Sequence, residues 1–371
     1  MSPFEFATAG RIVFGAGTFA QLDEMATGHG KRPFFVTGKR PIARSMFSVS
    51  DEPSIALVRE GVQAFRAAGC DLVIAIGGGS VIDAGKAIAA AAANPGDLLD
   101  YLEVIGKGQS LEAAPYPFIA VPTTAGTGSE VTRNAVLGSP EHGLKVSLRS
   151  PLMLPRVAIV DPELARSLPS ALTATTGLDA LTQLIEPYVC TRANPMTDNF
   201  CLHGIRHAAG SLARAYANGG DLEARTSMAW ASLLGGLALT NAGLGVVHGF
   251  AAPIGGMFHA PHGAVCAAIL PSGMRANIEA LRADNPQSPV LERYAVIARI
   301  VTGNPHATPE DGAQWVASLV RQLAIPSLAA YGIGTRDIPV LVEKAARASS
   351  MKANPVVLTP ARLTQVIENS L

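Results

Sequence analysis

Three side chains in the second half of the chain have the types and the surroundings of a metal site. His248 and His262 lie in a stretch rich in glycine and proline that also contains His259, so this stretch holds three of the eight histidines. Asp179 lies among apolar residues, where a carboxylate needs a partner. Two histidines and one carboxylate form a ligand set that leaves coordination positions open. The alternative is that these histidines are packed, hydrogen-bonded core residues.

A second group of residues is suited to holding phosphate. Residues 71–76 form an almost wholly apolar run of β-formers, which is typical of a strand buried on both faces of a parallel sheet. Glycines 77–79 allow a tight turn, and the spacing of Ser80 and Asp83 predicts a capping box before an alanine-rich helix. The helix N-terminus then suits a phosphate or pyrophosphate. The spacing matches neither the Rossmann fingerprint nor a P-loop, and a strand–turn–helix without a ligand is the alternative.

The end of an earlier strand bears on the choice of nucleotide. The strand predicted at residues 33–37 is followed by Gly38, Lys39 and Arg40, where dinucleotide sites often have an acid for the ribose 2′-OH. Two cations would better accept a 2′-phosphate, although a solvated loop is the alternative. The next strand, at residues 46–50, follows after too few residues for a parallel crossover. Either it is not a parallel neighbour, or the sequence omits a helix near residues 41–45, which is our hypothesis.

The remaining pattern predicts two domains. A strand at residues 117–121 precedes a second glycine- and hydroxyl-rich loop, so two such loops could converge on one ligand. Residues 1–162 are expected to form an α/β dinucleotide-binding domain with a parallel, Rossmann-like sheet, and residues 163–371 an all-helical domain for the metal and substrate. The main helices of the second domain are predicted at 171–188, 194–217, 222–244, 263–280, 289–301, 310–323, 338–348 and 360–369.

The composition argues against several classes of partner. The chain has 371 residues with 29 basic and 29 acidic side chains, which gives no electrostatic reason to expect nucleic acid or an anionic membrane. The beginning of the sequence has no signal-like segment, and the alanine-rich run at residues 87–93 is too short to span a bilayer. The 4 cysteines are scattered without a CxxC pair, which indicates free thiols in a cytoplasmic protein.

Five motifs together resemble one enzyme family. The segments are GGGSVIDAGKAIA, PTTAGTGSEVT, KVSLRSPLMLPRVAIVDP, GLDALTQLIEPY and GLGVVHGFAAPIGGMFHAPHG. They resemble the iron-containing (group III) alcohol dehydrogenases of the dehydroquinate synthase-like superfamily. The resemblance implies an N-terminal dinucleotide-binding α/β domain, a C-terminal helical domain and an active site between them.

The resemblance also implies residues that bind the cofactor. The pyrophosphate end of NAD(P) would be held by Gly77, Gly78, Gly79, Ser80 and Asp83. The cofactor cleft would be lined by Thr123, Thr124 and Thr127, and Lys145 would contact the nicotinamide ribose. Relatives with an aspartate in place of Gly38 resemble NAD users, whereas Gly38 with Lys39 and Arg40 looks more like the NADP users. The expected cofactor is therefore NADP or NAD, with NADP preferred.

The family binds a divalent metal, iron or sometimes zinc, through one aspartate and three histidines. Asp179, His248 and His262 match three of these positions, and Gln183 stands at the fourth. A glutamine carbonyl can coordinate, but more weakly than imidazole. Many relatives also have a proton-passing histidine where this chain has Ala252. We hypothesise that His259 or a water takes over this proton transfer.

These observations favour an NAD(P)-dependent, metal-assisted dehydrogenase of primary or secondary alcohols, or a reductase of the matching aldehydes or ketones. The metal would act as a Lewis acid, and hydride would pass between the substrate carbon and the nicotinamide. One alternative is a metal-independent, maleylacetate-type oxo-acid reductase, which Gln183 and Ala252 favour and the retained ligands oppose. Another is a non-catalytic nucleotide-binding protein. The resemblance further implies a homodimer or larger homo-oligomer.

Overall fold

The computed structural model describes residues 3–39, 44 and 46–371. The chain forms two compact units, and each is described by itself. The α/β unit consists of Ala7–Thr124 and Gly128–Arg166, and the helical unit of Ser167–Leu371, Ala125–Thr127 and the first residues up to Phe6. An α/β part followed by an all-helical part is the fold class that the sequence predicts, and this prediction is confirmed.

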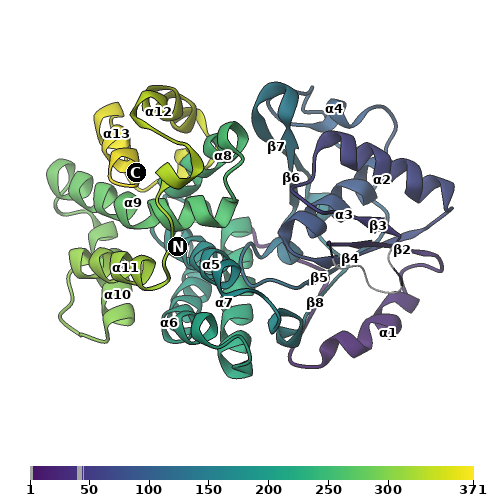
Figure 1. Cartoon of the computed structure of the whole chain (residues 1–371), viewed down its shortest axis with the longest axis horizontal. Helices are drawn as coiled ribbons and strands as arrows, with labels where there is room; N and C mark the ends of the chain where they lie inside the picture. Colours follow the sequence, from purple (N-terminus) through teal and green to yellow (C-terminus); the bar gives the residue numbers. More distant parts are fainter. Residues whose placement is uncertain (1–2, 40–43, 45) are drawn as a thin grey trace. The chain divides into compact units, whose positions relative to one another are not determined.

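The α/β unit is built on a six-stranded sheet in the order β1-β8-β5-β4-β2-β3, in which every pair is parallel. Figure 1 shows helix α1 on one face of this sheet and helices α2 and α3 on the other. A separate antiparallel hairpin joins β6 and β7. The strands are β1 (Arg11–Phe14), β2 (Pro33–Thr37), β3 (Phe47–Ser48), β4 (Leu72–Gly77), β5 (Phe118–Pro122), β6 (Asn134–Ser139), β7 (Leu144–Arg149) and β8 (Val157–Val160). The helices are α1 (Leu22–Thr27), α2 (Ile55–Ala67), α3 (Gly79–Ala93) and α4 (Leu98–Tyr101).

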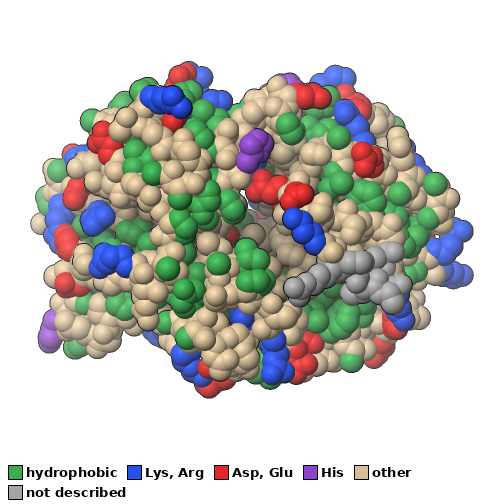
Figure 2. Space-filling model, viewed as in Figure 1, with side chains coloured by type: hydrophobic (Ala, Val, Ile, Leu, Met, Phe, Trp, Pro, Cys, Tyr) green, Lys and Arg blue, Asp and Glu red, His purple; other side chains and the backbone are tan. Residues whose placement is uncertain are grey.

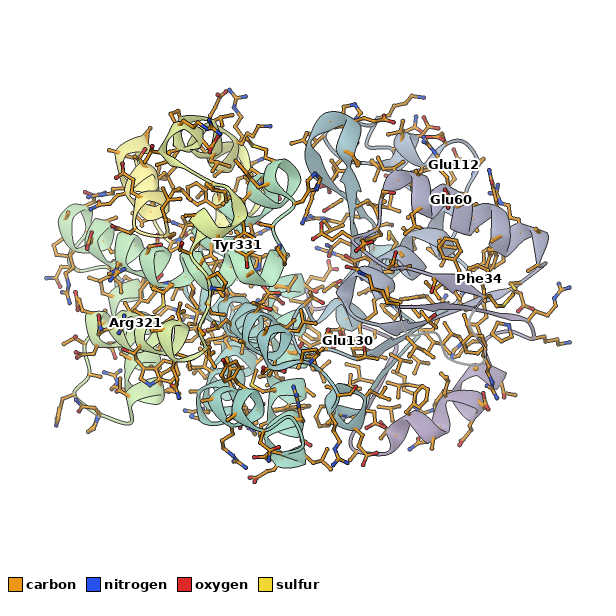
Figure 3. The ribbon with its side chains drawn as sticks, in the orientation of Figure 1. Phe34, Glu60, Glu112, Glu130, Arg321 and Tyr331 are labelled. Carbon is orange, nitrogen blue, oxygen red and sulfur yellow. The ribbon has the colours of Figure 1, made fainter. Side chains whose placement is uncertain are left out.

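Both faces of the sheet are buried, as the apolar strands predict. On β4, Val73 and Ala75 pack in the cluster that contains α2 and α3, whereas Ile74 and Ile76 pack in the cluster that contains α1. On β2, Phe34 (labelled in Figure 3) belongs to the first cluster, where its ring meets Phe65 edge to face at 5.6 Å. Because successive side chains of a strand point to opposite faces, an unbroken apolar run is the pattern that such a sheet requires.

The pairing of β3 excludes one of the two explanations for the short connection between β2 and β3. Val36 pairs with Phe47 and Thr37 with Ser48 in parallel register. The alternative that this strand is not a parallel neighbour is therefore wrong. Residues 40–43 and 45, near which we hypothesise an omitted helix, lie outside the described residues.

The helical unit is organised around α5, whose residues from Gly177 to Val189 are all buried. Helix α5 packs against α6, α7, α9 and α10. The helices are α5 (Ser170–Val189), α6 (Pro195–Ala217), α7 (Leu222–Asn241), α8 (Val246–Phe258), α9 (His262–Asp284), α10 (Pro289–Thr302), α11 (Pro309–Gln322), α12 (Ile338–Arg347) and α13 (Pro360–Glu368). Short 3₁₀ helices occur at Thr18–Gln21, Ser129–Val131, Pro140–His142, Pro151–Met153, Pro162–Ala165, Leu328–Tyr331, Thr335–Asp337 and Ser350–Ala353.

Helix starts in this unit follow a clear local signal. A hydroxyl or amide side chain caps the first turn, and a proline occupies the first helical position, at the starts of α6, α10, α11 and α13. The capping side chain accepts a hydrogen bond from a free N–H, while proline lacks the N–H that would otherwise stay unpaired. The four starts predicted from the sequence agree with the structure within one residue. Helix α8 was not predicted, because its glycines and Pro253 indicate turns.

Among the described residues, no single helix is long and apolar enough to cross a bilayer. Helices α7 and α8 reach the required length and hydropathy only when taken together, and they meet at an angle of 96°. On the face shown in Figure 2, cationic and anionic side chains are interspersed.

A buried lysine holds the helix after the glycine turn in place. Lys86 on α3 is 1% exposed, and burial lowers the pKa of its amine. Its Nζ donates to Ser129 O at 2.8 Å, Thr132 Oγ1 at 2.8 Å and Asn134 O at 2.7 Å, and it lies 3.7 Å from Asp83 Oδ1. These contacts join α3 to residues 129–134, which follow the second glycine- and hydroxyl-rich loop.

Replacement of Lys86 by methionine is expected to lower the free energy of unfolding by about 3 kcal/mol, because several buried acceptors lose their donor. Urea denaturation followed by circular dichroism measures this change. The matched control is Lys39→Met, since the Lys39 side chain is 68% exposed, and its effect should stay within about 0.5 kcal/mol. A loss below about 1 kcal/mol for Lys86→Met would show that the segment does not depend on the amine.

Candidate active site

Four potential metal ligands from three helices meet inside the helical unit. Asp179 comes from α5, His248 from α8, and His262 and Cys266 from α9. One ligand atom of each lies within 4.8 Å of the corresponding atom of the other three. Asp179 Oδ1 is 3.5 Å from His248 Nε2 and 3.7 Å from His262 Nε2. The geometry thus brings together the aspartate and the two histidines that the sequence singles out.

Several buried polar atoms in and next to this cluster lack hydrogen-bond partners. Asp179 is 1% exposed and His248 is 6% exposed. Asp179 Oδ1, His248 Nε2 and Gln183 Oε1 are three of the four buried side-chain nitrogen and oxygen atoms in the described part of the chain that make no hydrogen bond. Because an unpaired buried polar group costs about 1–3 kcal/mol, a concentration of them in one place indicates a missing partner. A divalent cation fits this donor set of carboxylate and imidazole.

A carboxylate behind His248 fixes the orientation of its ring. His248 Nδ1 lies 2.6 Å from Glu186 Oε2, and the Val247 backbone N–H donates to Glu186 Oε1 at 2.7 Å. A proton on Nδ1 leaves the lone pair of Nε2 directed at the cluster, as in many metal-bound histidines. The sequence prediction missed Glu186. Its signal was the spacing of seven residues from Asp179, which places both carboxylates on one face of the helix.

Gln183 contacts the cluster through Asp179. Its Nε2 donates to Asp179 Oδ2 at 3.0 Å, so the amide orients the carboxylate with Oδ1 toward the histidines. Cys266, the other residue that the prediction missed, follows His262 by four residues, and its Sγ lies 3.6 Å from His262 Nε2. The spacing of four residues was the available signal, because it places the two side chains on one helical face.

The charges of the cluster respond strongly to one another. Burial raises the pKa of Asp179, but the neighbouring His262 and His248 outweigh it and hold this pKa below its ordinary value. Burial lowers the pKa of His248, but Cys266 and Glu186 outweigh it and raise this pKa far above the ordinary value. Burial raises the pKa of the Cys266 thiol to about 12. A divalent cation in this cluster would compete with protons for the same nitrogen, oxygen and sulfur atoms.

His259 and Ala252 occupy different kinds of position. His259 ends α8 in the left-handed conformation, with φ 52°, and is exposed. Ala252 lies on α8 and is half-buried, four residues after His248 and on the same helical face. The proposed proton transfer by His259 therefore stays a prediction.

The glycine turn of the α/β unit presents a helix N-terminus, but by a different local structure than predicted. Helix α3 begins at Gly79 with Gly78 as its N-cap, and no side chain caps it. The predicted Ser80–Asp83 capping box is wrong, because the glycines let the chain enter the helix earlier. Asp83 instead accepts hydrogen bonds from Ser129 Oγ and the Val136 N–H. The N–H groups of the first turn are thus left free of side-chain caps.

Close packing explains why residue 77 is glycine. A Cβ at Gly77 would lie 2.5 Å from Val81 Cγ2, which is closer than real contacts allow. The Thr123 N–H donates to Gly77 O at 2.9 Å, and a Cβ at Gly78 would lie 3.3 Å from the Thr124 methyl group. The glycine turn and the start of the second loop are therefore neighbours within this unit. Thr127 is grouped with the helical unit.

The residues expected near the ribose groups make contacts of their own. Gly38 O accepts a hydrogen bond from Ser48 Oγ at 3.1 Å, and Lys39 Nζ lies 3.2 Å from Asp51 Oδ1, with both side chains exposed. Lys145 on β7 pairs with Glu52, with Nζ 2.6 Å from Oε1. Arg40 lies outside the described residues. Contacts of these side chains with a nucleotide stay predictions.

Comparison with known proteins identifies the class of both units. The family model described as "Iron-containing alcohol dehydrogenase" matches residues 9–162. The model described as "Fe-containing alcohol dehydrogenase family, C-terminal" matches residues 173–371. The chain belongs to the iron-containing alcohol dehydrogenase family.

Individual relatives agree with this assignment. The chain is similar to alcohol dehydrogenase 4 of Saccharomyces cerevisiae, with 38% identity over 319 residues, 86% of this chain and 80% of the relative. It is similar to the NAD-dependent methanol dehydrogenase of Bacillus methanolicus, with 36% identity over 326 residues, 86% and 82% of the two chains. A crystal structure of a 1,3-propanediol oxidoreductase covers 100% of both chains with a TM-score of 0.89 and 33% identity.

The family settles the general chemistry. The chain is an oxidoreductase that acts on alcohols, and a nicotinamide dinucleotide and a divalent metal are the cofactors of the family. The prediction of an alcohol dehydrogenase of this family that acts on small molecules is confirmed.

Proposed function

We propose that this protein is an NADP-preferring, metal-assisted alcohol dehydrogenase that also reduces the matching aldehydes or ketones. The observation that carries the proposal is the cluster of Asp179, His248 and His262, in which the buried atoms Asp179 Oδ1 and His248 Nε2 lack hydrogen bonds. When bound, the metal supplies Lewis-acid chemistry, which lowers the pKa of an alcohol or polarises a carbonyl.

The side chains of the helical unit have separate tasks in this proposal. Asp179, His248 and His262 hold the metal, and Glu186 keeps the proton of His248 on Nδ1. Gln183 orients Asp179 through its amide nitrogen, and the family resemblance places Gln183 itself at the fourth ligand position. His259, exposed at the end of α8, passes the proton of the alcohol to solvent.

The glycine turn and the polar loop that follows β5 hold the nucleotide. The uncapped start of α3 binds the pyrophosphate, with cofactor contacts from Gly77, Gly78, Gly79, Ser80, Asp83, Thr123, Thr124 and Thr127. Lys145 contacts the nicotinamide ribose. Gly38 leaves room for the 2′-phosphate of NADP, and Lys39 supplies a positive charge beside it.

The proposal also covers the roles of the two domains, the oligomeric state, the cellular compartment and the partners. Residues 1–162 act as the dinucleotide-binding part and residues 163–371 as the metal and substrate part of a homodimer or larger homo-oligomer. The 4 cysteines are all free and buried, which supports a reducing, cytoplasmic setting. Substrates are small alcohols, aldehydes or ketones, without nucleic acid or membrane partners.

Metal analysis combined with kinetics tests this function. Protein purified without chelator is expected to contain near-stoichiometric iron or zinc and to oxidise NADPH faster than NADH with an aldehyde. Chelation should abolish turnover, and added metal should restore it. Turnover that persists without metal would overturn the proposal in favour of a metal-independent oxo-acid reductase. Binding of NADPH without turnover of any substrate in a broad panel would indicate a non-catalytic protein.

A further inference from the structure

Cys266 lies among the metal ligands although the sequence comparison gives it no role. It is 0% exposed, and its Sγ is one of the four ligand atoms that all lie within 4.8 Å of one another. The Sγ is 3.6 Å from His262 Nε2, the contact that the spacing of four residues on α9 creates. The cluster also contains unpartnered, buried atoms of Asp179 and His248, so the position of the thiol is not the sole sign of a ligand.

Gln183, the alternative fourth ligand, is engaged through its amide nitrogen, whereas its Oε1 makes no hydrogen bond. Its Nε2 donates to Asp179 Oδ2, which ties the amide to the carboxylate. A neutral amide oxygen is also a poorer ligand for iron or zinc than a thiolate, which both metals bind readily. The amide nitrogen of Gln183 thus fixes the direction of Asp179, and the sulfur of Cys266 lies among the other ligand atoms.

We propose that the Cys266 thiolate is the fourth protein ligand of the metal, so that the centre is Asp179, His248, His262 and Cys266. The inference rests on the proposed function, which requires a metal in this cluster. On binding, the thiol loses its proton to solvent, the Sγ–metal bond forms, and no electron is transferred. A sulfur ligand with two imidazoles favours zinc, a borderline-soft ion, over harder divalent ions.

The other cysteines provide a matched control. Cys201 is 0% exposed, lies in the same helical unit on α6, and does not belong to the ligand cluster. Cys266→Ser keeps the size of the side chain and replaces sulfur by oxygen, whereas Cys201→Ala removes an equally buried sulfur elsewhere. A loss of metal binding in the first variant alone therefore reports coordination, not general damage to the core.

X-ray absorption of the zinc-loaded, unmodified protein tests the proposal without any variant. We expect one sulfur at about 2.3 Å and nitrogen or oxygen ligands at about 2.0–2.2 Å from the metal. Cobalt-substituted protein should show a sulfur-to-cobalt charge-transfer band that Cys266→Ser lacks and Cys201→Ala retains. Competition with a chelator should show metal binding weakened by more than about 100-fold in Cys266→Ser, beyond the usual effect of an outer contact.

Two outcomes overturn the proposal, and they are distinguishable. Stoichiometric zinc with only nitrogen and oxygen neighbours would remove Cys266 from the site but leave the metal-assisted function intact. Wild-type protein that binds no metal under any loading condition would overturn both. If Cys266→Ser does not fold, the spectrum of the wild-type protein still decides between these outcomes.

Discussion

Asp179→Ala is expected to lower kcat/KM for alcohol oxidation by about 10³-fold or more and to remove the metal. Asp179 Oδ1 lies 3.5 and 3.7 Å from the facing nitrogens of His248 and His262, so this carboxylate is the shared anionic contact of both imidazoles. Loss of metal-assisted charge stabilisation costs several kcal/mol, and each 1.4 kcal/mol corresponds to a factor of about ten in rate.

Elemental analysis and steady-state kinetics on the same preparations measure this result. The control is Asp284→Ala, which removes an exposed carboxylate that pairs with Arg362 in the same unit. Asp284→Ala should keep its metal and its activity within about threefold. An Asp179→Ala protein that retains both the metal and more than a tenth of the activity would contradict the proposed ligand set.

Gly38→Asp is expected to lower kcat/KM for NADPH by about 100-fold and to leave the value for NADH nearly unchanged. A carboxylate within a few ångströms of a phosphate costs several kcal/mol at the intermediate dielectric of a protein surface. The structure has room for the side chain, because a Cβ at Gly38 would make an ordinary contact of 3.7 Å with Val81 Cγ2. The change should therefore act through charge, not through a steric clash.

Kinetics with both cofactors measure the preference. The control is Gly28→Asp, since a Cβ at Gly28 would meet no atom within 4 Å and this residue follows α1, away from the end of β2. The control should keep the wild-type ratio of NADPH to NADH. An unchanged ratio in Gly38→Asp would place the 2′-phosphate elsewhere, whereas an equal loss with both cofactors would indicate local misfolding.

The sequence predicted the elements whose signals are local. The apolar strands, the parallel sheet and the proline-marked helix starts depend on neighbouring residues, and the structure has them at the expected places. Two local predictions were wrong for identifiable reasons. Helix α8 tolerates glycine and Pro253 because tertiary packing outweighs local propensity. The Ser80–Asp83 cap gives way to Gly78, because a glycine allows the tighter turn.

The candidate site was predicted in part, and the missing part is tertiary. Asp179, His248 and His262 could be found because their residue types stand out in apolar or glycine-rich surroundings. Cys266 could not be assigned in the same way, because a buried cysteine is common without a ligand role. Glu186 also lies among apolar residues, but the sequence does not show which side chain it pairs with. Their contacts with His248 and His262 become visible only when α5, α8 and α9 are assembled.

The way in which α8 begins has a consequence for the stability of the folded protein. No residue next to the start of α8 caps it, and its first N–H groups are bound by Asn354 and Glu186, which lie 108 and 61 positions away in the chain. The first turn of the helix that carries His248 is therefore completed by distant parts of the chain. One of these parts, α5, also carries the proposed ligand Asp179. Free metal at 100 times its dissociation constant adds about 2.7 kcal/mol to the stability of the folded state. We therefore expect that a protein with the proposed metal resists proteolysis better than the metal-free protein, in addition to being more active.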